Sequence, residues 1–216
     1  MPTTELKSLF PTPWMRVRGL LRGEDLAGCV ALAQSRQSQR NAYSGQLHHS
    51  AIAQPSDHPL FERIERLASA PMAQFGEHLF GEKLKWHIKE IWSNVLAPGG
   101  AQAVHAHTNS FISGIVFLNP MHPSTRTVFH RSLGGRDFLF SNDHAGIRMG
   151  PYNGNKWVMP PVDPGDMVLY PSYLLHEVPR NEGGERLTMA FNALPERLDA
   201  WGYRVEFHSS RESPDR

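Results

Sequence analysis

The spacing of hydrophobic residues changes after the first third of the chain. In the first third, apolar residues recur every three or four positions, which predicts amphipathic helices over residues 24–39 and 57–81. Pro71 falls inside the second segment and is expected to kink or restart that helix. Between the two helices, residues 40–55 are polar and contain glycine and proline, so a loop is predicted there.

From Lys85 onward, apolar and polar residues alternate in short runs, which predicts β-strands. Glycines and prolines between the runs supply the turns. The predicted strands are 85–96, the run that carries His105 and His107, 111–118, 126–130, 136–140, 156–159, 167–171, 185–194 and 203–207. Because no helical segment intervenes, an antiparallel sandwich or barrel is favoured over a parallel βαβ sheet.

Length and composition are those of an ordinary globular protein, with 216 residues of which 40% are hydrophobic and 20% charged. We expect one domain over residues 1–216, with a helical part to about residue 84 and a β-barrel core over 85–208. The net charge of +1 gives no electrostatic reason to expect a nucleic-acid or membrane partner. Cys29 is the only cysteine, which suits a reducing compartment, and no signal peptide or long apolar run is recognised. A cytoplasmic location is therefore expected.

Two histidines in the second predicted strand are the first candidates for chemistry. Side chains two positions apart on a strand project to the same face, so His105 and His107 can offer two imidazoles to one metal. The chain has twelve histidines, and one such pair would arise by chance. The pair is therefore informative only together with other residues.

The strand over residues 185–194 places polar side chains on one face and apolar side chains on the other. Its polar face carries Arg186, Thr188 and Asn192. If helices cover the outside of a barrel, this face lies inside, where an unpaired arginine is very costly and needs an anionic partner such as a small carboxylate. Alternatively, Arg186 forms an ion pair with a surface acid such as Glu182.

The order of these residues resembles that of the iron(II)/2-oxoglutarate-dependent dioxygenases. His105-x-His107 is followed by His176 and then by Arg186-x-Thr188. The longer motifs are W-x-N, H-x-H-x-N-S-x-x-S-G, P-G-D-x-x-x-Y-P-S-x-L-x-H and R-x-T-x-x-F-N. Together they are similar to a group of bacterial 2-oxoglutarate/iron oxygenases of unassigned substrate, from about residue 9 to residue 192.

This resemblance implies a mainly β, α+β protein: a double-stranded β-helix, or jelly-roll and cupin-like barrel, with N-terminal helices packed on the outside. It implies that His105, His107 and His176 bind Fe(II), and that Arg186 with Thr188 binds the far carboxylate of 2-oxoglutarate. O2 would be the oxidant, and a peptide, amino acid or metabolite would be hydroxylated with release of succinate and CO2.

Other positions follow from the same resemblance. His107 stands where the superfamily usually has a carboxylate, although the narrower group has His-x-His. If His107 is not a ligand, the candidate carboxylates are Asp137, Asp143 and Asp166. Asn94 is a candidate for the C1 carboxylate of 2-oxoglutarate or for the substrate. From strand position alone, Asn192, Arg136 and Trp157 are expected at the substrate end, and Asn192 is also a candidate for binding the cosubstrate.

A cupin-type metal-binding barrel, either a 2-oxoglutarate-independent enzyme or a non-catalytic ligand-binding protein, is the alternative. The spacing from Gly99 to His105-x-His107 fits the first cupin motif, but the glutamate that should follow is absent and Arg186-x-Thr188 has no cupin role. In either case we expect a small-molecule or peptide substrate and no nucleic-acid or membrane partner, with a homodimer left open.

Overall fold

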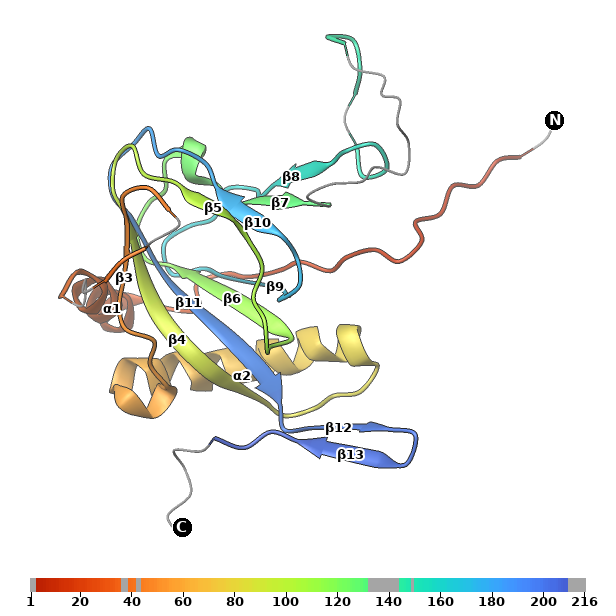
Figure 1. Cartoon of the computed structure of the whole chain (residues 1–216), viewed down its shortest axis with the longest axis horizontal. Helices are drawn as coiled ribbons and strands as arrows, with labels where there is room; N and C mark the ends of the chain where they lie inside the picture. Colours follow the sequence, from red (N-terminus) through yellow and green to blue (C-terminus); the bar gives the residue numbers. More distant parts are fainter. Residues whose placement is uncertain (1–2, 36–38, 42–43, 132–143, 149, 210–216) are drawn as a thin grey trace.

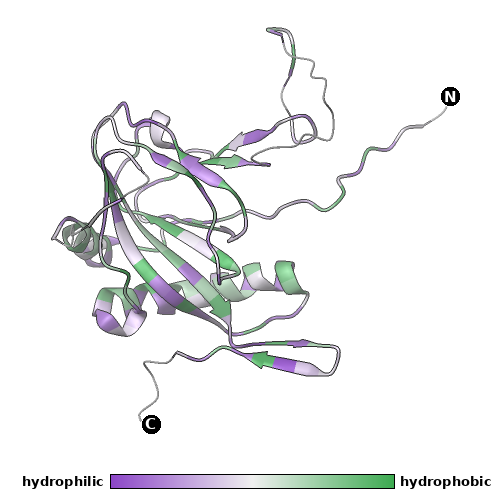
Figure 2. Ribbon diagram, in the orientation of Figure 1, coloured by the Kyte–Doolittle hydropathy of each residue, from purple (hydrophilic) through white to green (hydrophobic). Residues whose placement is uncertain are grey.

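The computed structural model describes residues 3–35, 39–41, 44–131, 144–148 and 150–209, whose strands form antiparallel sheets (Figure 1). The largest sheet has the order β1-β9-β6-β11-β4-β3-β2. Its strands are β1 (Met15–Val17), β2 (Gln39–Arg40), β3 (Leu47–His49), β4 (Trp86–Leu96), β6 (Ile112–Phe117), β9 (Met167–Pro171) and β11 (Arg186–Pro195). β4 and β11 pair along their whole lengths at its centre, and Figure 2 shows apolar and polar residues alternating along both strands.

A smaller sheet with the order β5-β10-β7-β8 lies across from the large one (Figure 1). Its strands are β5 (Gln102–His105), β7 (Val128–His130), β8 (Lys156–Val158) and β10 (His176–Val178). The two sheets enclose a small core of Ile115, Phe117, Phe129, Met159, Val168 and Tyr170. This core packs beside the polar interior in which the candidate site lies.

Two helices cover the outer face of the large sheet, as Figure 1 shows. They are α1 (Gly23–Ser35) and α2 (Pro59–Phe80), and the 3₁₀ turn η1 (Pro55–Asp57) directly precedes α2. A second 3₁₀ turn, η2 (Pro123–Thr125), lies between β6 and β7 in the chain. α2 begins where the His58 side chain accepts a hydrogen bond from the Leu60 N–H, and it ends at Gly81, whose φ of 72° suits glycine. The helix continues through Pro71, so the chain does not restart there. In the described part of the chain, no helix is long and apolar enough to span a membrane.

The predicted strands agree with the structure where it describes them, but β1 and β10, the strand that carries His176, were not predicted. Two further differences lie near the site. The loop predicted over residues 40–55 is wrong in part, because β3 forms there and pairs with the end of β4. This pairing gives hydrogen-bond partners to backbone groups of β4 that would otherwise be unpaired at the edge of the sheet. β5 ends at His105, so His107 lies just beyond the strand. The predicted strand 136–140 lies outside the described residues.

At the C-terminal end, β12 (Arg197–Ala200) and β13 (Tyr203–Glu206) form a separate hairpin that projects from the sheets (Figure 1). The sequence predicts only its second strand. The mainly β, α+β class with helices outside the sheet is confirmed, whereas the single-domain boundaries stay a prediction.

Candidate metal and cosubstrate site

His105 and His176 face each other at the ends of two paired strands. His105 ends β5, His176 begins β10, and the two are direct cross-strand partners. The Nδ1–H of each ring donates to the backbone carbonyl two residues earlier: His105 to Ala103 at 2.8 Å and His176 to Leu174 at 2.9 Å. With the proton on Nδ1, the Nε2 atom of each ring is the hydrogen-bond acceptor and the nitrogen that could bind a metal, which is how metal-binding histidines are commonly oriented.

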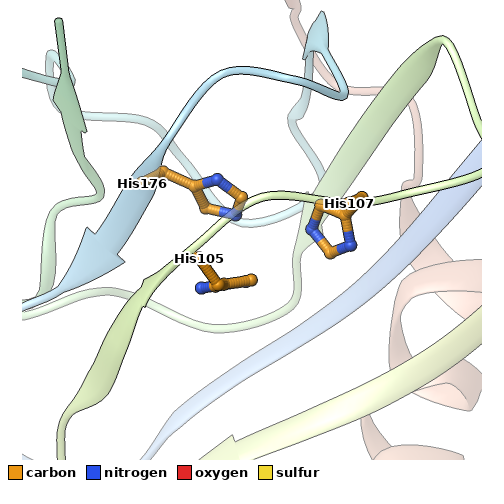
Figure 3. Close-up of side chains that lie close together, drawn as sticks. All are labelled: His105, His107 and His176. Carbon is orange, nitrogen blue, oxygen red and sulfur yellow. The ribbon is translucent and has the colours of Figure 1, made fainter. Parts of the chain in front are cut away.

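His107 completes a cluster of three imidazoles, shown in Figure 3. Its backbone N–H donates to Ser172 O at 3.0 Å, which fixes the chain just after β5. One ring nitrogen from each histidine lies within 4.8 Å of the others. The ring centroid of His107 is 5.2 Å from each of the other two rings, which are 4.2 Å apart. The structure therefore brings together the three histidines predicted from the sequence, with His107 the most distant.

Arg186, the first residue of β11, is buried beside this cluster. Its Nε and Nη2 atoms have no hydrogen-bond partner among the described residues. Burial lowers the pKa of its guanidinium to about 10, which leaves it a cation at neutral pH. A buried cation without a partner is strongly unfavourable, so Arg186 is the side chain in this region that most needs an anion.

The histidines and Arg186 line one narrow cavity between the sheets. The described residues that line it are Trp92, Asn94, Gln102, His105, His107, Ile115, Thr127, Tyr170, His176, Val178, Arg186, Thr188 and Ala190. None of them is acidic. The cavity volume is about 20 Å³, room for roughly one water molecule, so a ligand larger than water needs side chains to move.

Comparison with known proteins relates this arrangement to one family. Residues 90–192, close to half of the chain, match the family model described as "Putative 2OG-Fe(II) oxygenase". No curated protein matches the sequence. Among solved structures, HygX from Streptomyces hygroscopicus with nickel and 2-oxoglutarate bound gives a TM-score of 0.61 at 14% identity, covering 85% of this chain and 83% of HygX.

Two further structures are similar in fold. SnoN, a non-heme α-ketoglutarate-dependent epimerase from nogalamycin biosynthesis, gives a TM-score of 0.60 at 15% identity, with 86% of this chain and 80% of SnoN covered. A Pseudomonas putida prolyl-4-hydroxylase gives 0.55 at 15% identity, with 84% and 92% covered.

The matched segment runs from β4 into β11 and contains the three histidines and Arg186. The core of the barrel matches the 2OG-Fe(II) oxygenase family. The double-stranded β-helix expected from the sequence is confirmed by the structural neighbours. The family uses iron(II), 2-oxoglutarate and O2.

The side chains of the oxygenase barrel suit these cofactors. Burial lowers the pKa of His105, lowers that of His107 to about 4 with a further contribution from the His105 charge, and lowers that of His176 well below its ordinary value. All three rings are therefore neutral at pH 7, as imidazole ligands must be. The unpartnered guanidinium of Arg186 fits a carboxylate.

The remaining predicted residues divide into two groups. Thr188 and Asn94 are cross-strand partners and line the cavity with Arg186. Asn192 is buried, but its amide bonds Glu90 and Ser113 instead of lining the cavity. Trp157 is half-exposed on β8 and packs on Trp14 and Phe129, also away from the cavity lining.

The alternative carboxylates do not reach the histidines in the part of the chain that the structure describes. The Asp166 carboxylate binds the Arg16 guanidinium and the Gly19 N–H, near the start of β9. Arg136, Asp137 and Asp143 lie outside the described residues.

Three polar residues of the cavity were not identified from the sequence. The side-chain amide of Gln102 lies 3.4 Å from His105 Nε2. Tyr170 is fully buried and its hydroxyl lies 3.0 Å from His176 Nε2, to which it donates because Nδ1 carries the ring proton. Thr127 is buried with a hydroxyl that has no partner among the described residues. The Y-P-S motif around Tyr170 was a usable signal, whereas the strand that carries Thr127 has no comparable pattern.

Proposed function

We propose that this oxygenase hydroxylates a C–H bond of a peptide, amino acid or other metabolite. Each turnover would consume one O2 and one 2-oxoglutarate and would yield the hydroxylated product, succinate and CO2. Because its structural neighbours include an epimerase as well as a prolyl hydroxylase, hydroxylation is the proposal and not a consequence of the fold.

The observation that carries this proposal is the buried guanidinium of Arg186 beside the histidine cluster. A ligand with a carboxylate at one end would give Nε and Nη2 their missing acceptors. A keto acid at its other end could reach the histidines that line the same cavity. 2-Oxoglutarate has both ends in one molecule.

Each residue has a defined part in this proposal. His105, His107 and His176 form the iron site, and Arg186 with the Thr188 hydroxyl binds the far carboxylate. Asn94, which lines the same cavity, would donate to the nearer carboxylate or to the substrate. Iron, when bound, would supply the chemistry that couples oxidative decarboxylation of the keto acid by O2 to insertion of the second oxygen atom into the substrate C–H bond.

Tyr170 must move before iron can bind, because its hydroxyl occupies the lone pair of His176 Nε2. Its release would also widen the cavity between the histidines and Arg186. The walls formed by Trp92, Ile115 and Val178 would then keep water away from the reacting atoms.

The experiment is a turnover assay with purified protein, iron(II), O2 and 2-oxoglutarate, in which succinate is quantified by mass spectrometry. Pools of peptides, amino acids and metabolites are screened for stimulation of succinate release and for products heavier by one oxygen atom. His176→Ala should abolish succinate formation, while the exposed control His122→Ala should not. Conversion of a pool compound that does not need 2-oxoglutarate would instead support the cupin-type alternative.

A further inference from the structure

A line of buried and half-buried polar side chains runs from Ser172, just after β9, to His107. Ser113 Oγ lies 3.0 Å from Ser172 Oγ and donates to Asn192 Oδ1 at 2.7 Å. Asn192 Nδ2 in turn donates to Glu90 Oε1 at 2.7 Å and lies 3.3 Å from His107 Nδ1. Asn192 and Glu90 are cross-strand partners on β11 and β4, so the contact is part of the sheet.

The direction of the Asn192 amide follows from its neighbours. The carboxylate of Glu90, whose other oxygen is 3.5 Å from Lys89 Nζ, can only accept hydrogen bonds. The NH2 group of Asn192 must therefore face it, because a turned amide would oppose two oxygens. The second N–H of the same group points at His107 Nδ1, which must accept it.

A neutral imidazole that accepts at one nitrogen carries its proton on the other. His107 is thus protonated on Nε2, the reverse of His105 and His176, whose Nδ1–H groups bond backbone carbonyls. Metal-binding histidines almost always donate their second nitrogen to a carbonyl, carboxylate or water, as His105 and His176 do. His107 faces a donor instead.

The spacing of the rings agrees with this difference. The His107 ring centroid is 5.2 Å from each of the other two rings, which are 4.2 Å apart, so His105 and His176 form the closer pair.

We propose that Asn192, oriented by Glu90, is a positioning residue that keeps the His107 proton on Nε2. His107 then faces the iron site as a hydrogen-bond donor to an anionic oxygen of the cosubstrate or substrate, and the protein ligands of iron are His105 and His176. This inference rests on the proposed function and narrows the histidine cluster to two ligands and one donor.

The first test is nitrogen-15 NMR of the imidazoles in the full-length protein at pH 7.5, before and after addition of Zn²⁺. Without metal, His107 should show a protonated Nε2 and a bare Nδ1, and His105 and His176 should show the opposite. On addition of Zn²⁺, the Nε2 signals of His105 and His176 should shift while His107 keeps its Nε2 proton. A proton on Nδ1 of His107, or loss of its Nε2 proton to zinc, would overturn the proposal.

The second test is the affinity for Zn²⁺ alone. His107→Ala should weaken it less than about 3-fold. His105→Ala should weaken it by more than the roughly 10- to 100-fold that loss of a residue orienting a ligand produces. Equal losses in the two variants would identify His107 as a ligand and refute the proposal.

A designed variant tests the role of Asn192 directly. In Glu90→Gln/Asn192→Asp, the new carboxylate accepts from His107 and draws the proton to Nδ1, so Nε2 becomes free to bind metal. Zn²⁺ should then bind about 10-fold or more tightly than to the matched control Glu90→Gln, and adding His107→Ala should remove the gain. If the gain is absent although NMR places the proton on Nδ1, the proposal fails.

Failure of the proposed function gives a different result. If no Zn²⁺ binds to the natural protein, the iron site itself is refuted, and the spectrum of the metal-free protein still decides the state of His107.

Discussion

Replacing Arg186 with methionine tests both the fold and the proposed cosubstrate site. Methionine has similar length and no charge, so the variant removes a buried cation without opening a large cavity. The pKa of about 10 corresponds to a penalty of about 3 kcal/mol for holding the charged group inside the protein. If the guanidinium has no partner until a ligand binds, Arg186→Met should leave the free energy of unfolding unchanged or raise it by about 1–3 kcal/mol.

The same substitution should weaken 2-oxoglutarate binding strongly. Leaving a buried carboxylate without its partner costs about 2–5 kcal/mol, which corresponds to an increase in Kd of about 30-fold to several thousand-fold. The assay is an anaerobic titration of the iron(II) protein with 2-oxoglutarate and, in parallel, with 2-oxopentanoate, in which a methyl group replaces the far carboxylate. Exposed Arg22→Met is the matched control.

Only the natural protein and Arg22→Met should prefer 2-oxoglutarate over 2-oxopentanoate, while Arg186→Met should bind the two about equally. Two results would refute the reasoning. One is an unchanged Kd for 2-oxoglutarate in Arg186→Met, and the other is a loss of stability that shows the guanidinium to be paired in the folded chain.

Three further outcomes follow from other contacts. Tyr170→Phe removes the hydroxyl that occupies the His176 lone pair, so Zn²⁺ affinity measured by titration should rise about 2- to 10-fold; weaker binding would contradict this. Burial would raise the pKa of Asp166, but hydrogen bonds from backbone N–H groups and Arg16 outweigh it and hold the pKa below its ordinary value. The stability from this carboxylate is therefore present above the unfolded pKa of about 3.9 and is lost as pH falls through the lower folded pKa. Asp166→Asn should lower the free energy of unfolding at pH 7 by about 1–3 kcal/mol. It should also flatten the dependence of that free energy on pH below about 4. Urea titrations at several pH values measure both, and an unchanged pH dependence would contradict the prediction. Gly114→Ala would place a Cβ 2.1 Å from the Phe191 ring and should cost about 1–3 kcal/mol of stability in urea denaturation, while Gly184→Ala, with open space at its Cβ, should cost much less; equal losses would show that ring contact is not the cause.

The local pattern of the sequence was enough to predict most long strands of the barrel and the polar face of one of them. Along 185–194, alternation places Arg186, Thr188 and Asn192 on one face, and the structure forms β11 over nearly the same residues. The reason is local, because side chains alternate across a pleated strand whatever it pairs with. The order of His105, His176 and Arg186 along the chain then indicated the family.

Other features depend on contacts between residues that are far apart in the sequence. The polar segment before α2 contains β3 because the edge of β4 was open to pair with it. Tyr170 was not identified because its contact with His176 depends on how the chain turns between β9 and β10. No local pattern reports such pairings.

Whether the Arg186 guanidinium has a partner, and which ring nitrogen of His107 carries the proton, were decided only by the tertiary structure. Whether an arginine is unpaired depends on every acid that could reach it, so burial without a partner becomes visible only in the folded chain. His107 and Asn192 are 85 positions apart, and the donor that Asn192 presents is set by Glu90 on a neighbouring strand. The sequence determined that three histidines and one arginine meet in a barrel, whereas the hydrogen bonds around each ring, which depend on the packed sheet, decide which nitrogen each histidine offers to a metal.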